Sequence, residues 1–167
     1  IVFTRNKFKV FCDITETVLN GTNTNLVSVV NAGLQSGLAK KEKNVAFAPA
    51  GTATEMSFYH QTGSVYDIKE VEGASMFEAI VNALADLEDD YAANAKVVMK
   101  KADYYSIITS LANNSTALYA AQPEQVIGAP VIFCDLATTP VVGDFKYSHF
   151  NYDLNMLYDT DKNVKTG

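Results

Sequence analysis

The sequence of 167 residues contains no tryptophan and only two cysteines, two histidines and four prolines. Cys12 and Cys134 are too few and too far apart for a disulfide framework or for a zinc site, which needs clustered sulfur or imidazole ligands. His60 and His149 have no second histidine or cysteine at metal-binding spacing. A glycine-rich phosphate-binding loop is also missing. We therefore expect no cofactor and no metal or nucleotide chemistry.

Long apolar runs are missing as well. None approaches the roughly 18 residues of a membrane-spanning helix, so we expect no contact with a membrane. Hydrophobic residues nevertheless make up 48% of the chain and charged residues 19%, which is typical of one compact domain or two small lobes and excludes disorder. Residue 1 is Ile and no signal sequence follows it, so we expect a processed product or a part of a longer protein.

Basic residues are outnumbered by acidic ones, 13 to 19, which gives a net charge of −6. Such a surface repels a phosphate backbone, so we expect no direct nucleic-acid binding. The charge is uneven, because residues 1–50 carry +3 and residues 67–90 carry −7. Two solvated faces would explain this pattern. Opposite charges on one chain also suit a head-to-tail contact between copies, in which two different surfaces meet.

A long helix is predicted from about residue 24 to residue 45, where apolar residues recur at helical spacing. About 20 residues would make it roughly 30 Å long. Lys40, Lys41 and Lys43 favour its C-terminal end through the helix dipole. Gly33, on its apolar face, would allow another backbone to approach closely.

A second helix is predicted by the capping box at residues 75–78, and its apolar face continues to Tyr91. Glu88, Asp89 and Asp90 would then lie near its C-terminus, where the helix dipole disfavours carboxylates. A basic surface of another copy would offset that cost. The candidate contacts between copies are therefore these three acids and the basic group of the first helix: Glu88, Asp89, Asp90, Lys40, Lys41 and Lys43.

The other elements mix helices and strands without the regular alternation of a parallel doubly wound sheet, so we expect an α+β fold. A helix at 102–112 would carry Tyr105, Ile108 and Leu111 along one face, and the run at 131–134 reads as a strand buried on both faces. Further strands are expected at 8–13, 95–99, 117–120, 141–145 and 147–158.

Three stretches together resemble a known family. The first is the strand, turn and long helix of residues 8–47, and the second is the helix–strand–helix unit of residues 77–108. The third and most specific is the run of residues 126–131, with Gly128-Ala129-Pro130-Val131 at its end, followed by Gly143-Asp144-Phe145. In this order they resemble the major capsid proteins of tailed bacteriophages with the Hong Kong 97-type fold.

The resemblance implies a shell subunit of a phage or prophage, without enzymatic activity. It would assemble into pentamers and hexamers of an icosahedral capsid around double-stranded DNA. Its fold would comprise a long spine helix, a peripheral domain at 1–52 and 146–167, and a mixed-sheet axial domain at 53–145. Its partners would be other copies of itself, with a scaffold, protease or portal during assembly in the cytoplasm of the bacterial host. The family's N-terminal arm and extended loop would precede Ile1, so we expect the 167-residue chain alone to associate weakly.

Two other functions stay open from the sequence. An encapsulin, the shell protein of a bacterial nanocompartment, has the same fold and encloses enzymes instead of DNA. A small acidic metal-dependent enzyme would use Glu88, Asp89 and Asp90 or the polar loop at 159–163, which resembles the first half of a calcium-binding loop. On a helix, at most two of the three neighbouring acids could share one ion, because successive residues point about 100° apart.

Overall fold

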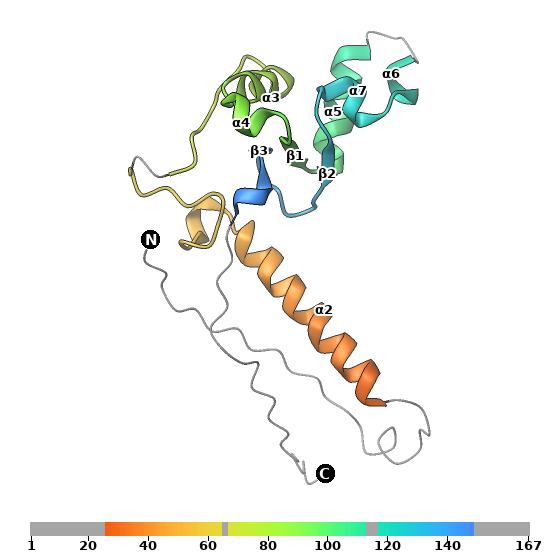
Figure 1. Cartoon of the computed structure of the whole chain (residues 1–167). Helices are drawn as coiled ribbons and strands as arrows, with labels where there is room; N and C mark the ends of the chain where they lie inside the picture. The colour runs from red at the N-terminus through yellow and green to blue at the C-terminus, as the bar shows by residue number, and fades with distance from the viewer. Residues whose placement is uncertain (1–25, 65–66, 113–116, 149–167) are drawn as a thin grey trace.

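The computed structural model describes residues 26–64, 67–112 and 117–148. Figure 1 shows short helices grouped around a small sheet, and a long helix, α2 (Leu26–Ala46), that extends away from this group. The mixed α+β class and the long helix are confirmed. The strand expected at 8–13 and most of the one expected at 147–158 lie outside the described residues. Within these residues, no helix combines the length and the hydrophobicity needed to cross a membrane.

Among the described residues the sheet has three strands, with β1 (Lys96–Met99) in the centre. It pairs in parallel with β2 (Val131–Phe133) and antiparallel with β3 (Val141–Gly143). Because successive residues of a strand point to opposite faces, Val97 and Met99 lie on one face and Val98 lies on the other. All three are buried, so both faces of the sheet are covered near its central strand.

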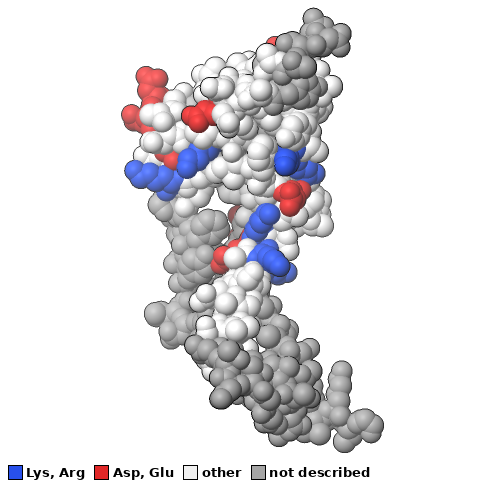
Figure 2. All heavy atoms as spheres, turned by 90° about the vertical axis from the view of Figure 1, so that its right-hand side faces the viewer, with Lys and Arg blue, Asp and Glu red and all other residues white. Residues whose placement is uncertain are grey.

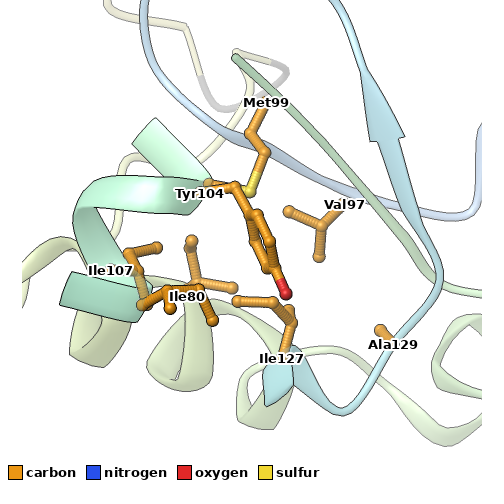
Figure 3. Close-up of a cluster of buried hydrophobic side chains, with 8 residues drawn as sticks. Ile80, Val97, Met99, Tyr104, Ile107, Ile127 and Ala129 are labelled. Carbon is orange, nitrogen blue, oxygen red and sulfur yellow. The ribbon is translucent and has the colours of Figure 1, made fainter. Parts of the chain in front are cut away.

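On the first face, the main core is built by α3 (Met76–Ala85), α5 (Lys101–Ala112) and α7 (Pro123–Ile127). Ile108, which is 1% exposed, is among its most deeply buried side chains. In Figure 3 the ring of Tyr104 lies in the middle of this core, between Val97 on one side and Ile80 and Ile107 on the other. Burial raises the pKa of the Tyr104 hydroxyl, with a smaller contribution from Tyr105.

On the second face, Val98 lies in a small cluster with Cys134 and Ala137, and Phe47 and Phe145 pack against it. The Phe58 ring lies 5.2 Å from that of Phe47 and 5.9 Å from that of Phe145. We call Phe47, Phe58 and Phe145 the aromatic joint. It attaches the C-terminal end of α2 to the sheet.

Hydrogen bonds reinforce the aromatic joint. The buried Ser57 hydroxyl donates to the carbonyl of Ala48 (2.8 Å) and accepts from the N–H of Tyr59 (3.1 Å). The Tyr59 hydroxyl donates to the carbonyl of Thr139 (2.7 Å), in the loop before β3. A short 3₁₀ helix, η1 (Ala50–Thr52), lies between α2 and this segment. The Tyr59 bond ties the chain after α2 to a residue 80 positions away.

The helix predicted to run to Tyr91 is interrupted, and this part of the prediction is wrong. α3 ends at Ala85, where the N–H of Asp86 donates to the carbonyl of Asn82, and α4 (Asp89–Ala92) begins after Glu88. Carboxylates stabilise the start of a helix and destabilise its end, so a new helix that starts at the acidic run is electrostatically favourable.

The capping box of α3 is present, but the second of its two hydrogen bonds goes to a neighbouring residue. The Ser75 hydroxyl accepts from the N–H of Glu78 (3.2 Å) as expected. The Glu78 carboxylate accepts from the N–H of Ala74 (3.0 Å), one residue before the N-cap. The amide side chain of Asn82 donates to the carbonyl of Glu72 (3.2 Å), which holds the preceding loop along the helix.

Three further expectations need correction. Residues 117–120 form a short helix, α6 (Ala117–Ala120), instead of a strand. β2 is an edge strand and is not buried on both faces, because β1 occupies the centre of the sheet: Ile132 and Phe133 are 45% and 41% exposed. β3 ends at Gly143, and a 3₁₀ helix, η2 (Phe145–Tyr147), follows it.

The buried face of α5 is also shifted by one residue from the expected line of Tyr105, Ile108 and Leu111. Ile108 is buried, but Tyr105 and Leu111 are 48% and 38% exposed. Tyr104 and Ile107 are buried in their place, next to β1. Both lines have helical spacing, so contact with the sheet decides between them.

Candidate functional site

The three acids of the predicted contact lie at the start of α4. Glu88 is its N-cap residue, and the N–H groups of Tyr91 and Ala92 both donate to the Glu88 carbonyl (2.9 Å). Asp89 and Asp90 form the first turn, and all three acids are exposed. Since carboxylates are favoured at the start of a helix, the dipole cost that a basic partner was expected to offset is absent. That argument for a contact between copies is wrong, although the exposed negative charge remains.

The three lysines of the predicted contact, Lys40, Lys41 and Lys43, are exposed in the C-terminal part of α2. In the described ranges they form no ion pair with Glu88, Asp89 or Asp90; the pair between Lys69 and Asp86 (2.6 Å) involves neither group. Basic and acidic side chains are interspersed across the middle of the face that Figure 2 shows. The structure therefore does not bring the two predicted contact groups together within one copy.

The two sequence motifs at 128–130 and 143–145 meet at one groove. It has a volume of about 740 Å³ and lies between the turn after α4, the turn from α7 into β2, and the start of η2. Gly128 ends α7 in a left-handed conformation (φ 83°), which glycine adopts without strain. The carbonyl of Pro130 accepts from the N–H of Val97, which aligns β2 with β1. The left-handed conformation thus gives a structural reason for glycine at position 128.

Asp144 lies in the wall of this groove. Its Oδ1 accepts from the N–H of Lys146 (3.0 Å), which starts η2. Its Oδ2 is buried and has no hydrogen-bond partner. Glu124 also lines the groove, as do the bases Lys96 and Lys146. The walls therefore hold charges of both signs, and one carboxylate oxygen lacks a donor.

The candidate residues for an enzyme site do not come together as a metal-binding group in the described ranges. Within the described ranges, no group of three or more His, Cys, Asp or Glu side chains could hold a metal ion. His60 is half-buried and its backbone N–H donates to the carbonyl of Ser57. Cys134 is a buried free thiol. Cys12, His149 and the loop at 159–163 lie outside the described residues.

The comparison with family models gives a match that covers nearly all of the sequence: the model of the phage capsid family matches residues 1–165. This chain belongs to the phage capsid family. A comparison with curated proteins found no match. Members of this structural family form the shell of the bacteriophage virion by self-association, so the chain is a capsid protein.

For a capsid protein, exposed aromatic side chains are candidate contact residues, since tyrosine and phenylalanine are enriched where proteins meet. Four aromatic residues of the sheet-containing part of this phage capsid protein are exposed in this way: Tyr91, Tyr105, Phe133 and Tyr147, each between 38% and 52% exposed. The sequence analysis placed Tyr91 and Tyr105 on helix faces, Phe133 in a buried strand and Tyr147 in a further strand. The signal that could have found Tyr105 is the second apolar line on α5, which leaves this residue outside the core.

Proposed function

We propose that this chain is a major capsid protein of a tailed phage or prophage with the Hong Kong 97-type fold. It assembles into pentamers and hexamers of an icosahedral shell that encloses double-stranded DNA. The observation that carries the proposal is the match to the phage capsid family over residues 1–165. A net charge of −6 agrees with a shell that encloses DNA without binding the phosphate backbone of the DNA.

The proposed subunit has a peripheral domain at 1–52 and 146–167 and an axial domain at 53–145, with α2 as the spine helix. Support comes from the aromatic joint. Phe47 lies before the first boundary, Phe58 lies after it, and Phe145 lies at the second boundary. The chain thus crosses between the proposed domains twice, and both crossings meet in one aromatic cluster.

Contacts between copies involve the exposed groups Glu88, Asp89 and Asp90 on α4 and Lys40, Lys41 and Lys43 on α2. Their charges remain available in a single copy because no ion pair joins the two groups within the described ranges. Replacing the three acids with Gln or Asn is expected to reduce assembly and its dependence on salt. Unchanged assembly and unchanged salt dependence would remove these acids from the contact.

The genes beside the coding sequence test the proposed function. Genes for a portal, a protease and a terminase are expected, because shell assembly in the host cytoplasm needs such partners. A neighbouring gene for a cargo enzyme, without these three, would contradict the proposal and indicate an encapsulin. Calorimetric titration with calcium, magnesium and manganese tests the enzyme alternative: no ion is expected to bind at a defined stoichiometry.

A further inference from the structure

One exposed aromatic surface lies on α5 and the adjacent edge strand. Tyr105 and Phe133 both touch the buried Tyr104, with ring centroids 5.6 Å apart in each pair. The Nζ of Lys101 lies 6.0 Å from the Tyr105 ring centroid. We call Lys101, Tyr105 and Phe133 the α5 patch.

The α5 patch has an exposed positive charge beside its rings. Lys101 is exposed, whereas Asp103, two residues along the helix, is half-buried. Tyr105 and Phe133 are 48% and 41% exposed, so the patch leaves two aromatic rings partly in water. Exposed aromatic side chains are enriched where proteins meet.

A second exposed aromatic surface lies on α4 and η2. The rings of Tyr91 and Tyr147 meet edge to face, with centroids 5.0 Å apart. Glu88, Asp89 and Asp90 directly precede Tyr91 on α4. We call Glu88, Asp89, Asp90, Tyr91 and Tyr147 the α4 patch.

The α4 patch is acidic and borders the groove. Lys146, whose Nζ lies 5.9 Å from the Tyr147 ring centroid, offsets one of its three negative charges. Ala92 and Lys146, the chain neighbours of Tyr91 and Tyr147, line the groove of about 740 Å³. Asp144 in the groove wall keeps a buried Oδ2 without a donor. This surface therefore suits a partner that brings an aromatic ring and a cation together.

The two patches lie toward different edges of the sheet. The strand order β2–β1–β3 places Phe133 on one edge strand, and Tyr147 follows the other edge strand by four residues. Figure 1 shows α4 on the left, above β3, and α5 on the right, beside β2. Two separate surfaces of this kind can join copies in a row or ring, because a heterologous contact pairs two different surfaces.

We propose that the α5 patch of one copy binds the α4 patch and the adjoining groove of the next copy. Tyr105 and Phe133 bury their exposed rings against Tyr91 and Tyr147, and Lys101 lies among the carboxylates of α4. A second copy is the occupant because this family self-associates, and because the cation and the carboxylates are complementary. The inference rests on the proposed function and names the surfaces that join neighbours within a pentamer or hexamer.

Assembly of the complete gene product that contains this chain tests the inference. Particles made in bacteria are separated from free subunits by sedimentation, and the assembled fraction is compared among variants. Tyr105→Ser and Tyr147→Ser are each expected to lower it, because a contact weakened tenfold, by about 1.4 kcal/mol, raises the subunit concentration that assembly needs. Leu111→Ser is the control, since Leu111 is 38% exposed on the same helix but outside the patch, and it is expected to assemble normally.

A charge exchange tests the pairing itself. Lys101→Glu alone, and Asp89→Lys with Asp90→Lys alone, each place like charges together and are expected to reduce assembly about tenfold. All three changes in one chain restore opposite charges and are expected to restore assembly. Thermal unfolding followed by circular dichroism verifies that every variant folds.

The outcomes separate the two proposals. Restored assembly in the exchanged chain, with the losses expected for the single-sided variants, supports the contact. If the unaltered protein forms shells and the variants assemble as well as it does, or if the exchange does not restore assembly, the inference is overturned while the proposed function stands. If the unaltered protein forms no shell, the proposed function fails and the inference fails with it.

Discussion

Replacing Gly73 with alanine tests how tightly the loop before α3 is held against that helix. A Cβ atom at Gly73 would lie 2.9 Å from the Cα of Ala79 and 2.9 Å from the carbonyl carbon of Glu78, and closer still to the Ala79 nitrogen. These backbone atoms belong to the first turn of α3, where Ser75 and Glu78 fix the chain by hydrogen bonds. They cannot move aside as the end of a flexible side chain would. Overpacking of this kind costs about 1–3 kcal/mol.

Thermal unfolding followed by circular dichroism measures this cost. In a chain of this size, 1 kcal/mol shifts Tm by about 2–4 °C, so the Tm of Gly73→Ala is expected to fall by about 2–12 °C. Gly33→Ala is the matched control, because a Cβ at Gly33 on α2 would meet no atom within 4 Å. Alanine favours a helix interior by about 0.5–1 kcal/mol, so this Tm is expected to stay or rise. A Tm of Gly73→Ala at or above that of the unaltered chain would refute the argument.

Two further predictions concern the core and an exposed loop. Ile108→Ala, at a side chain 1% exposed, is expected to cost about 2–5 kcal/mol in urea unfolding, and Leu111→Ala much less; equal costs would contradict the orientation of α5. At Asp67, desolvation acts to raise the pKa, but hydrogen bonds from the Thr62 hydroxyl and from the N–H groups of Thr62 and Ser64 outweigh it and hold the pKa below 3.8. These bonds are expected to persist above pH 3.8 and to break as the pH falls through the lowered pKa of Asp67. NMR titration of the backbone amides of Thr62 and Ser64 measures the midpoint of this change. A midpoint above pH 3.8 would contradict the lowered pKa.

The sequence predicted the features that depend on local chemistry. The helix expected from residue 24 to residue 45 is α2, and Ser75 caps α3 as the capping box indicates. The strand at 95–99 is β1, whereas the helix α7 before Gly128 was not predicted. In each confirmed case residues near in sequence determine the backbone, so their pattern alone is informative.

Features that depend on distant contacts were mispredicted. The apolar run at 131–134 is typical of a buried strand, but β1 takes the central position and leaves Phe133 at the edge. On α5, Tyr104 and Tyr105 are equally apolar, and packing against β1 buries the first. The acidic run after Ala85 is compatible with the end of one helix or the start of another, and the dipole favours the start.

Among the candidate contact residues, too, some could be predicted from the local sequence and others depend on distant contacts. Exposed charge at Glu88, Asp89 and Asp90 follows from composition, because carboxylates are seldom buried without a partner. The tyrosine pair beside them does not, since Tyr91 and Tyr147 are 56 residues apart in the sequence and meet only in the folded chain. Surfaces that assemble from distant segments are therefore visible only in the structure.

Electron cryomicroscopy of the particles formed by the complete gene product tests whether this chain is a capsid shell subunit. We expect closed icosahedral shells built of pentamers and hexamers, in which α5 and β2 of one subunit contact α4 and η2 of the next. A protein that remains monomeric at all concentrations and forms no closed shell would contradict this expectation.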